Sequence, residues 1–265
     1  MSQQKVFRLP SKGAGYNVIE EHSEPIPRPG PHEVLLQVHA TTLNYRDLVI
    51  ANGGYPFPVK DNVVILSDGA GTIVEVGSDV QDISKGDYAI SNFDISNIYG
   101  AQQDWLHGLG GPIDGMLRQY VTLPATAIVK VPKTTTMSWV SSLHWDQEAL
   151  KITNGRGADF IIENGGSGTI AKSLACIARG GINAVVGFLD QAKEMPDVAS
   201  LVLGSGAVVR GINVGSKQLT DDLVMFVCEK NLDVPVEKTF GFSKEEVIEA
   251  FKYLEAAGHV GIEVK

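Results

Sequence analysis

The stretch Ser141–Lys172, SSLHWDQEALKITNGRGADFIIENGGSGTIAK, decides how the second half of this chain folds. Its later part places an apolar run before a glycine-rich turn and a helix-forming segment, which predicts a buried strand, a tight turn and a helix. Dinucleotide-binding domains begin in the same way, because such a turn and the helix N-terminus offer N–H groups to a phosphate. The question is whether Gly166-Ser167-Gly168 is that loop.

The segments after this stretch alternate between helix and strand patterns. TIAKSLACIARGG (169–181) predicts a helix that ends at glycine, and INAVVGFL (182–189) predicts a strand. AVVRGINVG (207–215) predicts a further strand, and KQLTDDLVMFVCEK (217–230) predicts an amphipathic helix. Strands that alternate with helices indicate a parallel sheet.

The first half of the chain is rich in short strands. Four segments with β-branched residues and alternating polarity predict strands: EVLLQVHA (33–40), GTIVEVG (71–77), RQYVTLP (118–124) and AIVKVP (127–132). NYRDLVIANG (44–53) predicts a short helix, and the segment after Ser243 predicts a helix and a final strand. Frequent short strands are typical of a partly open β-barrel.

Composition limits the functions that this chain can have. Its 265 residues carry a net charge of −9 and no basic run, so nucleic acid is not an expected partner. No apolar stretch is long enough to span a membrane, and the first residues lack the apolar core of a signal peptide, so we expect a cytoplasmic protein. Two cysteines cannot form a four-cysteine zinc site.

Several motifs resemble those of one family, the medium-chain dehydrogenase/reductase superfamily, in its zinc-independent, quinone-oxidoreductase-like and alcohol-dehydrogenase-like branch. They are LNYRDLVIANGGYP, SDGAGTIVEVGSDV, KGDYAI and GGPIDGMLRQYVTLPATAIVKVP in the first half, and RGINVGS and EAFKYLEAAGHVG in the second. The resemblance implies an α/β protein with a GroES-like, partly open β-barrel catalytic domain (1–132 and 237–265). It also implies a shortened Rossmann-like domain with a parallel sheet (133–236).

One block of that family is absent. After MSWVSSL the family continues with the βαβαβ unit that carries the glycine-rich diphosphate loop, whereas here Leu143 leads directly into His144. The missing part, the first half of the nucleotide-binding domain, amounts to roughly 70 residues, since one βαβ unit takes about 30 or more. The turn at Gly166–Gly168 is a fair match to the loop pattern, with Asp190 where a ribose-binding acid belongs. The resemblance favours a different, purely structural turn.

The resemblance also implies catalytic residues. Where zinc-dependent relatives place cysteine, histidine and glutamate, this chain has Asn44, Ser67 and Asp68, so we expect no zinc. Asn44 and Tyr45 are the catalytic candidates, because a hydrogen-bond donor would have to polarise a carbonyl in place of a metal. The alternatives remain open that Tyr45 is a tyrosine at the edge of the core, and that the Asp68 carboxylate binds backbone amides. Arg46 and Asp47 are expected to form a local pair.

Further candidates concern the substrate and the cofactor. Asp68, Trp105 and Leu106 are expected to border a pocket for a small-molecule substrate. The alternative remains open that Trp105 and Leu106 only pack against neighbouring side chains. The carboxyl ends of parallel strands bind ligands, and the resemblance places a nicotinamide cofactor, NADPH or NADH, there. The residues expected to border this cofactor are Gly165, Gly166, Gly187, Phe188, Leu189, Val214 and Gly215.

Two hypotheses follow from these observations. The first is a zinc-independent NAD(P)(H)-linked oxidoreductase that acts on a small carbonyl, enone, quinone or alcohol. The second is a non-catalytic shortened variant that binds a small molecule or another subunit and has lost dinucleotide binding. Half of a sheet leaves a strand edge and an apolar face exposed, which favours association. The resemblance implies a homodimer formed through the strand AVVRGINVG.

Overall fold

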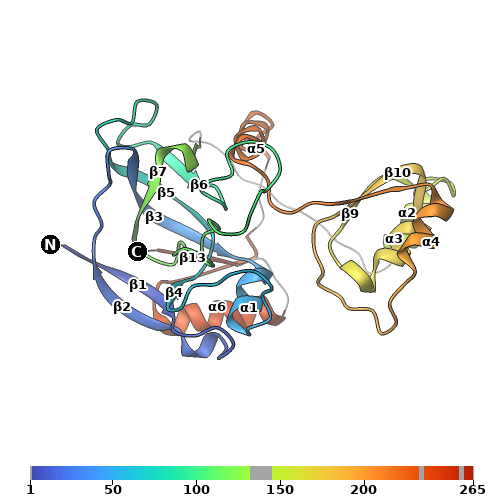
Figure 1. Ribbon diagram of the computed structural model, residues 1–265, viewed down its shortest axis with the longest axis horizontal. Helices are drawn as coiled ribbons and strands as arrows, with labels where there is room; N and C mark the ends of the chain where they lie inside the picture. Colours follow the sequence, from blue (N-terminus) through green and yellow to red (C-terminus); the bar gives the residue numbers. More distant parts are fainter. Residues whose placement is uncertain (1, 132–144, 233–235, 257–259, 265) are drawn as a thin grey trace. The chain divides into compact units, whose positions relative to one another are not determined.

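The long strand β3 (Glu33–Leu43) is the centre of the first half of the fold. It pairs antiparallel with β5 (Asp68–Val76), β7 (Tyr120–Pro124) and β13 (Val260–Glu263) in a seven-stranded sheet of order β12-β13-β3-β5-β6-β8. The computed structural model describes residues 2–131, 145–232, 236–256 and 260–264 (Figure 1). Gly71 allows β5 to approach β3 closely, because a Cβ there would collide with the carbonyl of Gln37.

Two further layers enclose the core of this half. A smaller sheet of order β2-β1-β4 lies beside helices α1 (Tyr45–Ala51) and α6 (Lys244–Ala256). Aromatic pairs fill the interior, since Phe7 meets Phe242 edge to face and Tyr16 stacks on Phe251. The remaining elements here are β1 (Gln3–Leu9), η1 (Tyr16–Val18), β2 (Glu20–Pro25), β4 (Val63–Val64), β6 (Tyr88–Ser91), η2 (Ala125–Ala127), β8 (Ile128–Lys130), α5 (Lys217–Glu229) and β12 (Lys238–Phe240).

The second half contains the predicted parallel sheet. β10 (Ile177–Val185) pairs in parallel with β9 (Ala158–Glu163) on one side and with β11 (Val208–Gly211) on the other. Helices α3 (Ile170–Ala175) and α4 (Val198–Ser205) pack on one face around a small core of Ile170, Leu174, Ile177 and Ala207. Helix α2 (Trp145–Ile152) precedes β9, and the short helix η3 (Gly166–Gly168) follows it. The α/β fold class with a Rossmann-like sheet is therefore confirmed.

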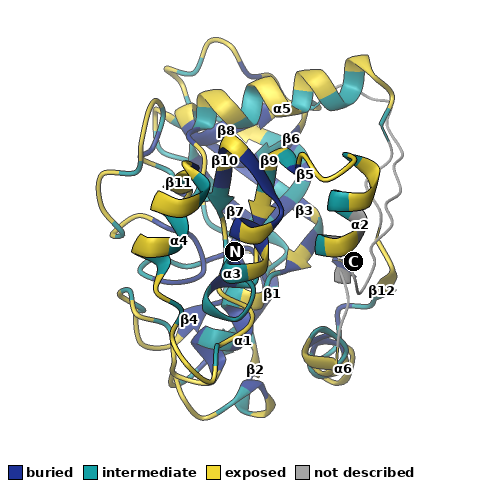
Figure 2. Ribbon diagram, turned by 90° about the vertical axis from the view of Figure 1, so that its right-hand side faces the viewer, coloured by how far each residue is buried: buried dark blue, intermediate teal, exposed yellow. Residues whose placement is uncertain are grey.

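Two details of the predicted elements were wrong. The apolar run of β9 was expected to be a buried strand, yet Phe160 and Ile162 are 74% and 71% exposed (Figure 2 colours β9 by this exposure). The reason is that α3 and α4 pack on the opposite face of the sheet, to which Ile161 belongs. The helix after Thr169 was expected to extend to the glycine pair, but it ends at Ala175. Ile177 already pairs with β9, and Gly180 adopts a φ of +76° where the register of β10 shifts.

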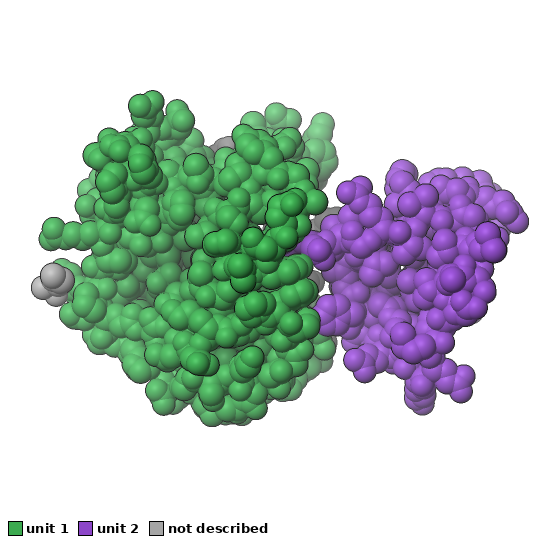
Figure 3. Space-filling view, in the orientation of Figure 1, with its two compact units in different colours: residues 1–139, 215–265 green, residues 140–214 purple. Residues whose placement is uncertain are grey.

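The chain forms two compact units (Figure 3). The first comprises Met1–Trp139 and Gly215–Lys265, and the second comprises Val140–Val214. Helix α5 thus belongs to the first unit, whereas the sequence assigned it to the nucleotide-binding domain. Its start is tied to the first unit, since N–H groups of Lys217 and Gln218 donate to carbonyls of Asn97 and Ile98. No helix in the described ranges is long and apolar enough to cross a membrane.

Candidate active site

The start of helix α1 is built around Asn44 and Asp47. Asn44 is the N-cap residue with extended backbone angles, and its N–H donates to the Asp47 carboxylate at 2.8 Å. An acidic side chain in the first turn also interacts favourably with the positive end of the helix. The segment NYRD therefore fixes the direction in which the Asn44 side chain leaves the helix.

Asn44, Ser67 and Asp68 form one hydrogen-bonded cluster. The amide of Asn44 donates from Nδ2 to Oδ2 of Asp68 at 2.8 Å, and the Ser67 hydroxyl donates to Oδ1 at 2.9 Å. Thr41 on β3 donates to the backbone carbonyl of Asp68 and so anchors the start of β5. The structure thus joins a predicted catalytic residue, Asn44, to a predicted substrate-binding residue, Asp68.

Asp47 is fully buried behind this cluster. Burial raises the pKa of its carboxyl to about 7, although Arg46 and the Asn44 N–H oppose this shift; the negative charge of Asp68 adds to it. Nη1 of Arg46 lies 3.6 Å from Oδ1 of Asp47 without a direct hydrogen bond. The expected Arg46–Asp47 pair is present, and a neutral Asp47 is well populated near pH 7.

An aromatic cluster holds the Arg46 guanidinium. It lies 5.0 Å from the ring centroids of Tyr55 and Phe93, and Nε donates to the Tyr55 hydroxyl at 3.1 Å. Phe57 meets Tyr55 edge to face and stacks on Trp105 at 3.9 Å between centroids. Trp105 therefore packs into a cluster connected to α1. Leu106, next to it, is 56% exposed.

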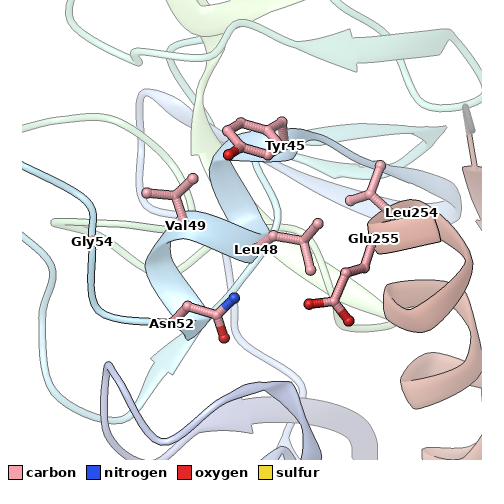
Figure 4. A pocket seen from close by; sticks show the side chains of 7 residues that line it. All are labelled: Tyr45, Leu48, Val49, Asn52, Gly54, Leu254 and Glu255. Atoms are coloured by element: carbon pink, nitrogen blue, oxygen red, sulfur yellow. The ribbon is translucent and has the colours of Figure 1, made fainter. Parts of the chain in front are cut away.

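Tyr45 borders a cleft of about 330 Å³ between α1 and α6 in the first unit (Figure 4). The tyrosine is 46% exposed, and within the described residues its hydroxyl makes no hydrogen bond. Glu255, on the opposite wall, accepts a hydrogen bond from the Tyr16 hydroxyl at 2.7 Å, and this bond raises the pKa of Tyr16. The residues that line the cleft are Tyr45, Leu48, Val49, Asn52, Gly54, Leu254 and Glu255.

The cluster at Asp68 does not have the chemistry of a zinc site. Zinc in proteins takes thiolate, imidazole or carboxylate ligands, and here one carboxylate stands with an amide and a hydroxyl. Both carboxylate oxygens already accept hydrogen bonds from these neighbours. Across the described parts of the chain, no group of three or more histidine, cysteine, aspartate or glutamate residues is arranged to hold a metal ion.

The turn at Gly166–Gly168 is occupied by the chain's own carboxylate. Glu163, at the end of β9 and 2% exposed, accepts hydrogen bonds through Oε1 from the N–H groups of Gly165 and Gly166 at 2.8 and 3.0 Å. The hydroxyls of Thr169 and Ser173 donate to the same carboxylate. These N–H groups are therefore not free for a diphosphate, and the interpretation of the turn as structural agrees with the geometry.

Electrostatics keep Glu163 ionised. Burial raises the pKa of its carboxyl, but the hydrogen bonds from Ser173, Thr169, Gly166 and Gly165 together outweigh burial and leave the pKa below its usual value. Sequence reasoning missed this residue. The signal was an acid that ends a strand immediately before a glycine pair.

A second loop packs against this turn. The backbone of Asp190 donates to Gly165 and accepts from Gly168, and Leu189 donates to the carbonyl of Asn164 at 3.1 Å. Glycine at 187 permits this approach, because a Cβ would collide with Asn164. Phe188 and Leu189 remain 60% and 48% exposed at the edge of the second unit.

The last two predicted cofactor residues follow β11. Val214 ends the second unit, and Gly215 begins the returning part of the first unit. Gly165 and Gly166 follow the end of β9, and the segment Gly187–Leu189 follows the end of β10. These residues therefore lie together at the carboxyl end of the parallel sheet. Ligands bind at that end in related sheets.

Two known protein families match this chain. The family described as the alcohol dehydrogenase GroES-like domain matches residues 30–133, and the family described as zinc-binding dehydrogenase matches residues 123–262, which is more than half of the chain. The chain belongs to the medium-chain dehydrogenase/reductase superfamily. This superfamily member has 28% identity to a zinc-type alcohol dehydrogenase-like protein of Schizosaccharomyces pombe, with 94% of this chain and 95% of the relative covered.

Solved structures share the fold. A Sinorhizobium meliloti protein assigned as an alcohol dehydrogenase superposes with a TM-score of 0.84 at 23% identity, covering 99% of both chains. Another protein from the same organism, assigned as a zinc-binding dehydrogenase and solved with NADP bound, gives 0.76 at 16% identity, covering 99% of this chain and 100% of its own. An acryloyl-coenzyme A reductase of Sulfurisphaera tokodaii is 34% identical over 49% of this chain and 40% of its own length.

The alignment with the fission-yeast relative is longer than the part of this chain that it covers. It extends over 330 positions, while 94% of this 265-residue chain is about 249 residues, so about 80 positions have no counterpart here. This size agrees with the absence of roughly half a nucleotide-binding domain. The junction Leu143–His144, to which the sequence assigned the absence, lies outside the described residues.

Proposed function

We propose that this chain is a zinc-independent NAD(P)(H)-linked oxidoreductase that transfers a hydride to or from a small carbonyl, enone, quinone or alcohol. Superfamily membership supports an oxidoreductase, and the NADP bound to one structural relative supports a nicotinamide cofactor. The bound cofactor supplies the hydride chemistry, whereas the protein contributes position and electrostatics.

The observation that carries this proposal is the hydrogen-bonded Asn44–Ser67–Asp68 cluster. An amide and a hydroxyl each donate to one oxygen of the Asp68 carboxylate, at positions that by resemblance match the metal ligands of zinc-dependent relatives. A site of this kind offers hydrogen bonds to a reacting oxygen rather than a Lewis acid. It favours an enzyme that works without zinc.

Tyr45 and Asn44 act on the substrate oxygen in this proposal. The exposed phenol of Tyr45 donates a hydrogen bond to the carbonyl oxygen, and Asn44 contributes its second N–H, because only one is engaged with Asp68. Trp105 and Leu106 supply apolar surface to the substrate. Removing one such donor costs about 100- to 1000-fold in turnover.

On the cofactor side, Gly187, Phe188, Leu189, Val214 and Gly215 border the nicotinamide in this proposal. Gly165 and Gly166 serve through close packing, because Glu163 holds their N–H groups. The diphosphate is therefore bound elsewhere or more weakly than in full-length relatives. The loss of three or four charge-assisted hydrogen bonds weakens binding by orders of magnitude.

The test is a titration of the purified chain with NADPH and with NADH, followed by nicotinamide fluorescence and melting temperature. We expect saturable binding, and turnover of an enal or primary alcohol that survives chelator treatment with less than one zinc per ten chains. A folded chain that binds neither nucleotide overturns the proposal. Stoichiometric zinc whose removal abolishes turnover overturns its metal-free form.

The proposal includes a cytoplasmic homodimer, formed through the β11 edge of the second unit. β11 is an edge strand in the described sheet, so its outer backbone groups can pair with a second copy. Sedimentation velocity between 1 and 50 μM tests this part: a single species of twice the chain mass is expected, and a monomer throughout contradicts it.

A further inference from the structure

The Asp68 carboxylate, unlike that of the buried Asp47, can still accept hydrogen bonds from a ligand. An ionised carboxylate has about four lone-pair positions, and one hydrogen bond to each oxygen leaves two of them unused. Asp68 is partly exposed, whereas its donor Ser67 is 2% exposed and Asp47 is fully buried. The carboxylate of Asp68 is therefore held by two side chains, retains unused acceptor positions and belongs to a residue that is not fully buried.

The geometry points to Asp68 as the catalytic base that exchanges a proton with the substrate oxygen, with Asn44 and Ser67 as its positioning residues. This inference rests on the proposed function and assigns the proton half of that reaction. Asp68 lies at the first position of β5, where the bond from Thr41 to its carbonyl fixes the backbone. The two side-chain bonds then fix the plane of the carboxylate.

In alcohol oxidation the O–H bond breaks, and its proton moves to a carboxylate oxygen of Asp68. The electron pair of that bond forms the C=O π bond as the C–H bond breaks, and the C–H pair would leave as a hydride, for which a bound oxidised nicotinamide would be the acceptor. In the reverse direction, neutral Asp68 returns the proton to the developing alkoxide.

Asp47 is not a candidate for this role. Its Oδ2 accepts from the Asn44 backbone, and the side chain has no access to solvent or substrate. Asp47 from α1 and Arg46 beside it are the charged neighbours that bear on the cluster. Asp47 holds Asn44, and Asn44 holds Asp68, so a proton relay through Asp47 is unnecessary.

The kinetic experiment compares Asp68→Asn with Asp68→Glu and with Asp61→Asn, a control at an exposed acid of the same unit. Oxidation of primary alcohols from ethanol to hexanol is measured with NAD⁺ and NADP⁺ from pH 5 to 10. We expect Asp68→Asn to lower kcat by about 100-fold or more, the usual contribution of a general base, with KM changed less than threefold. Asp68→Glu recovers part of the loss, and Asp61→Asn stays within twofold.

A cofactor-free measurement tests the positioning residues. The Asp68 carboxyl carbon is assigned by ¹³C NMR as the signal that Asp68→Asn removes, and its chemical shift at pH 8 is compared in wild type, Ser67→Ala and Asn44→Ala. Each variant removes one hydrogen bond to the carboxylate, so both should move this chemical shift. A chemical shift that neither variant moves overturns the positioning part, and this readout does not depend on turnover.

The outcomes separate the two proposals. A wild-type chain that oxidises alcohols while Asp68→Asn remains within threefold of it overturns the base assignment and leaves the proposed function standing. A folded wild-type chain with no turnover overturns both. Melting temperatures identify unfolding of a variant. If Asp68→Asn does not fold, Ser67→Ala decides instead, with a fivefold or larger loss of kcat expected and no loss contradicting the inference.

Discussion

Asp47 is a buried acid that positions Asn44 at the start of α1 and has a perturbed pKa of its own. Its carboxylate caps the first turn of α1 and receives the Asn44 N–H, so it determines where Asn44 stands. The same position excludes water, and burial raises the pKa of the carboxyl to about 7. The Asp47 side chain therefore both positions Asn44 and carries a carboxyl group with a raised pKa.

The raised pKa of Asp47 predicts a specific pH dependence of stability. Between about pH 4 and 7 the folded chain retains a proton that the unfolded chain has lost, so Asp47 makes the folded state less stable as pH rises. Asp47→Asn removes this titration. We expect its stability relative to wild type to improve by roughly 2–4 kcal/mol between pH 4 and pH 8. Urea denaturation at several pH values measures it, and a constant difference would contradict the assignment.

At the residue scale, the sequence predicted the polar cluster only through family resemblance. Asn44, Ser67 and Asp68 were named because they stand where relatives bind zinc, and the structure shows how they satisfy one another. Spacing alone does not reveal such a cluster, since Asn44 and Asp68 are brought together by the pairing of β3 with β5. Glu163 was missed because its partners lie in a turn that was judged by its glycines alone.

At the element scale, Glu163 connects three pieces of structure. It ends β9, binds the two N–H groups of the following turn, and accepts from Thr169 and Ser173 at the start and middle of α3. A strand, a turn and a six-residue helix thereby share one buried carboxylate. The turn is stable without an external anion, because the chain supplies its own.

Replacing Glu163 with glutamine should loosen this junction. Glutamine keeps the shape but loses the charge, and its amide presents donors to groups that are themselves donors. We expect a loss of about 1.5–3 kcal/mol, with Glu194→Gln, at an exposed acid of the same unit, as control. Hydrogen exchange of the second unit's amides measures the change.

The pH dependence of this variant has the opposite sign to that of Asp47→Asn. The lowered pKa of Glu163 contributes stability above about pH 4.5, and this contribution fades as pH falls through the folded-state value. The deficit of Glu163→Gln should therefore shrink in acid. A deficit that persists unchanged at pH 3 would show that shape, rather than charge, sustains the turn.

The order and type of elements were largely predictable, whereas their ends and burial were not. The segment IARGG was taken as the end of a helix, although Ile177 pairs with Ala158 at the start of β10 and the glycines accommodate a shift in register. The local sequence pattern cannot distinguish a helix that continues to the glycine pair from a shorter helix followed by a strand, because glycine follows the helix in both cases. The β9 segment was judged buried from its apolar run, but α3 and α4 cover only the face that carries Ile161.

At the scale of the whole molecule, the second unit is a sheet with one covered face. Phe160, Ile182 and Val208 lie opposite one another across the three strands, and all three are exposed on the side without helices. The sequence predicted an exposed face from the absence of half a domain, and this expectation is confirmed. Such surfaces drive association.

Polar substitutions on this face should suppress association at little cost in stability. We expect Phe160→Ser with Ile162→Thr to lower 1-anilinonaphthalene-8-sulfonate fluorescence and raise solubility at least twofold, with a change in unfolding free energy within about 0.5 kcal/mol per site. Leu174→Ala, in the covered core, serves as the contrast and should cost about 2–5 kcal/mol. A loss from the double variant comparable to that of Leu174→Ala would show that the face is covered in solution.

The division of the chain has a mechanical consequence. Both ends of the protein belong to the first unit, and the second unit is inserted between Trp139 and Gly215. A force that pulls the two termini apart is therefore carried by the first unit, through strands such as β1 and β13. The inserted unit bears no tension until the first has opened, so stretching experiments should always record the larger extension first.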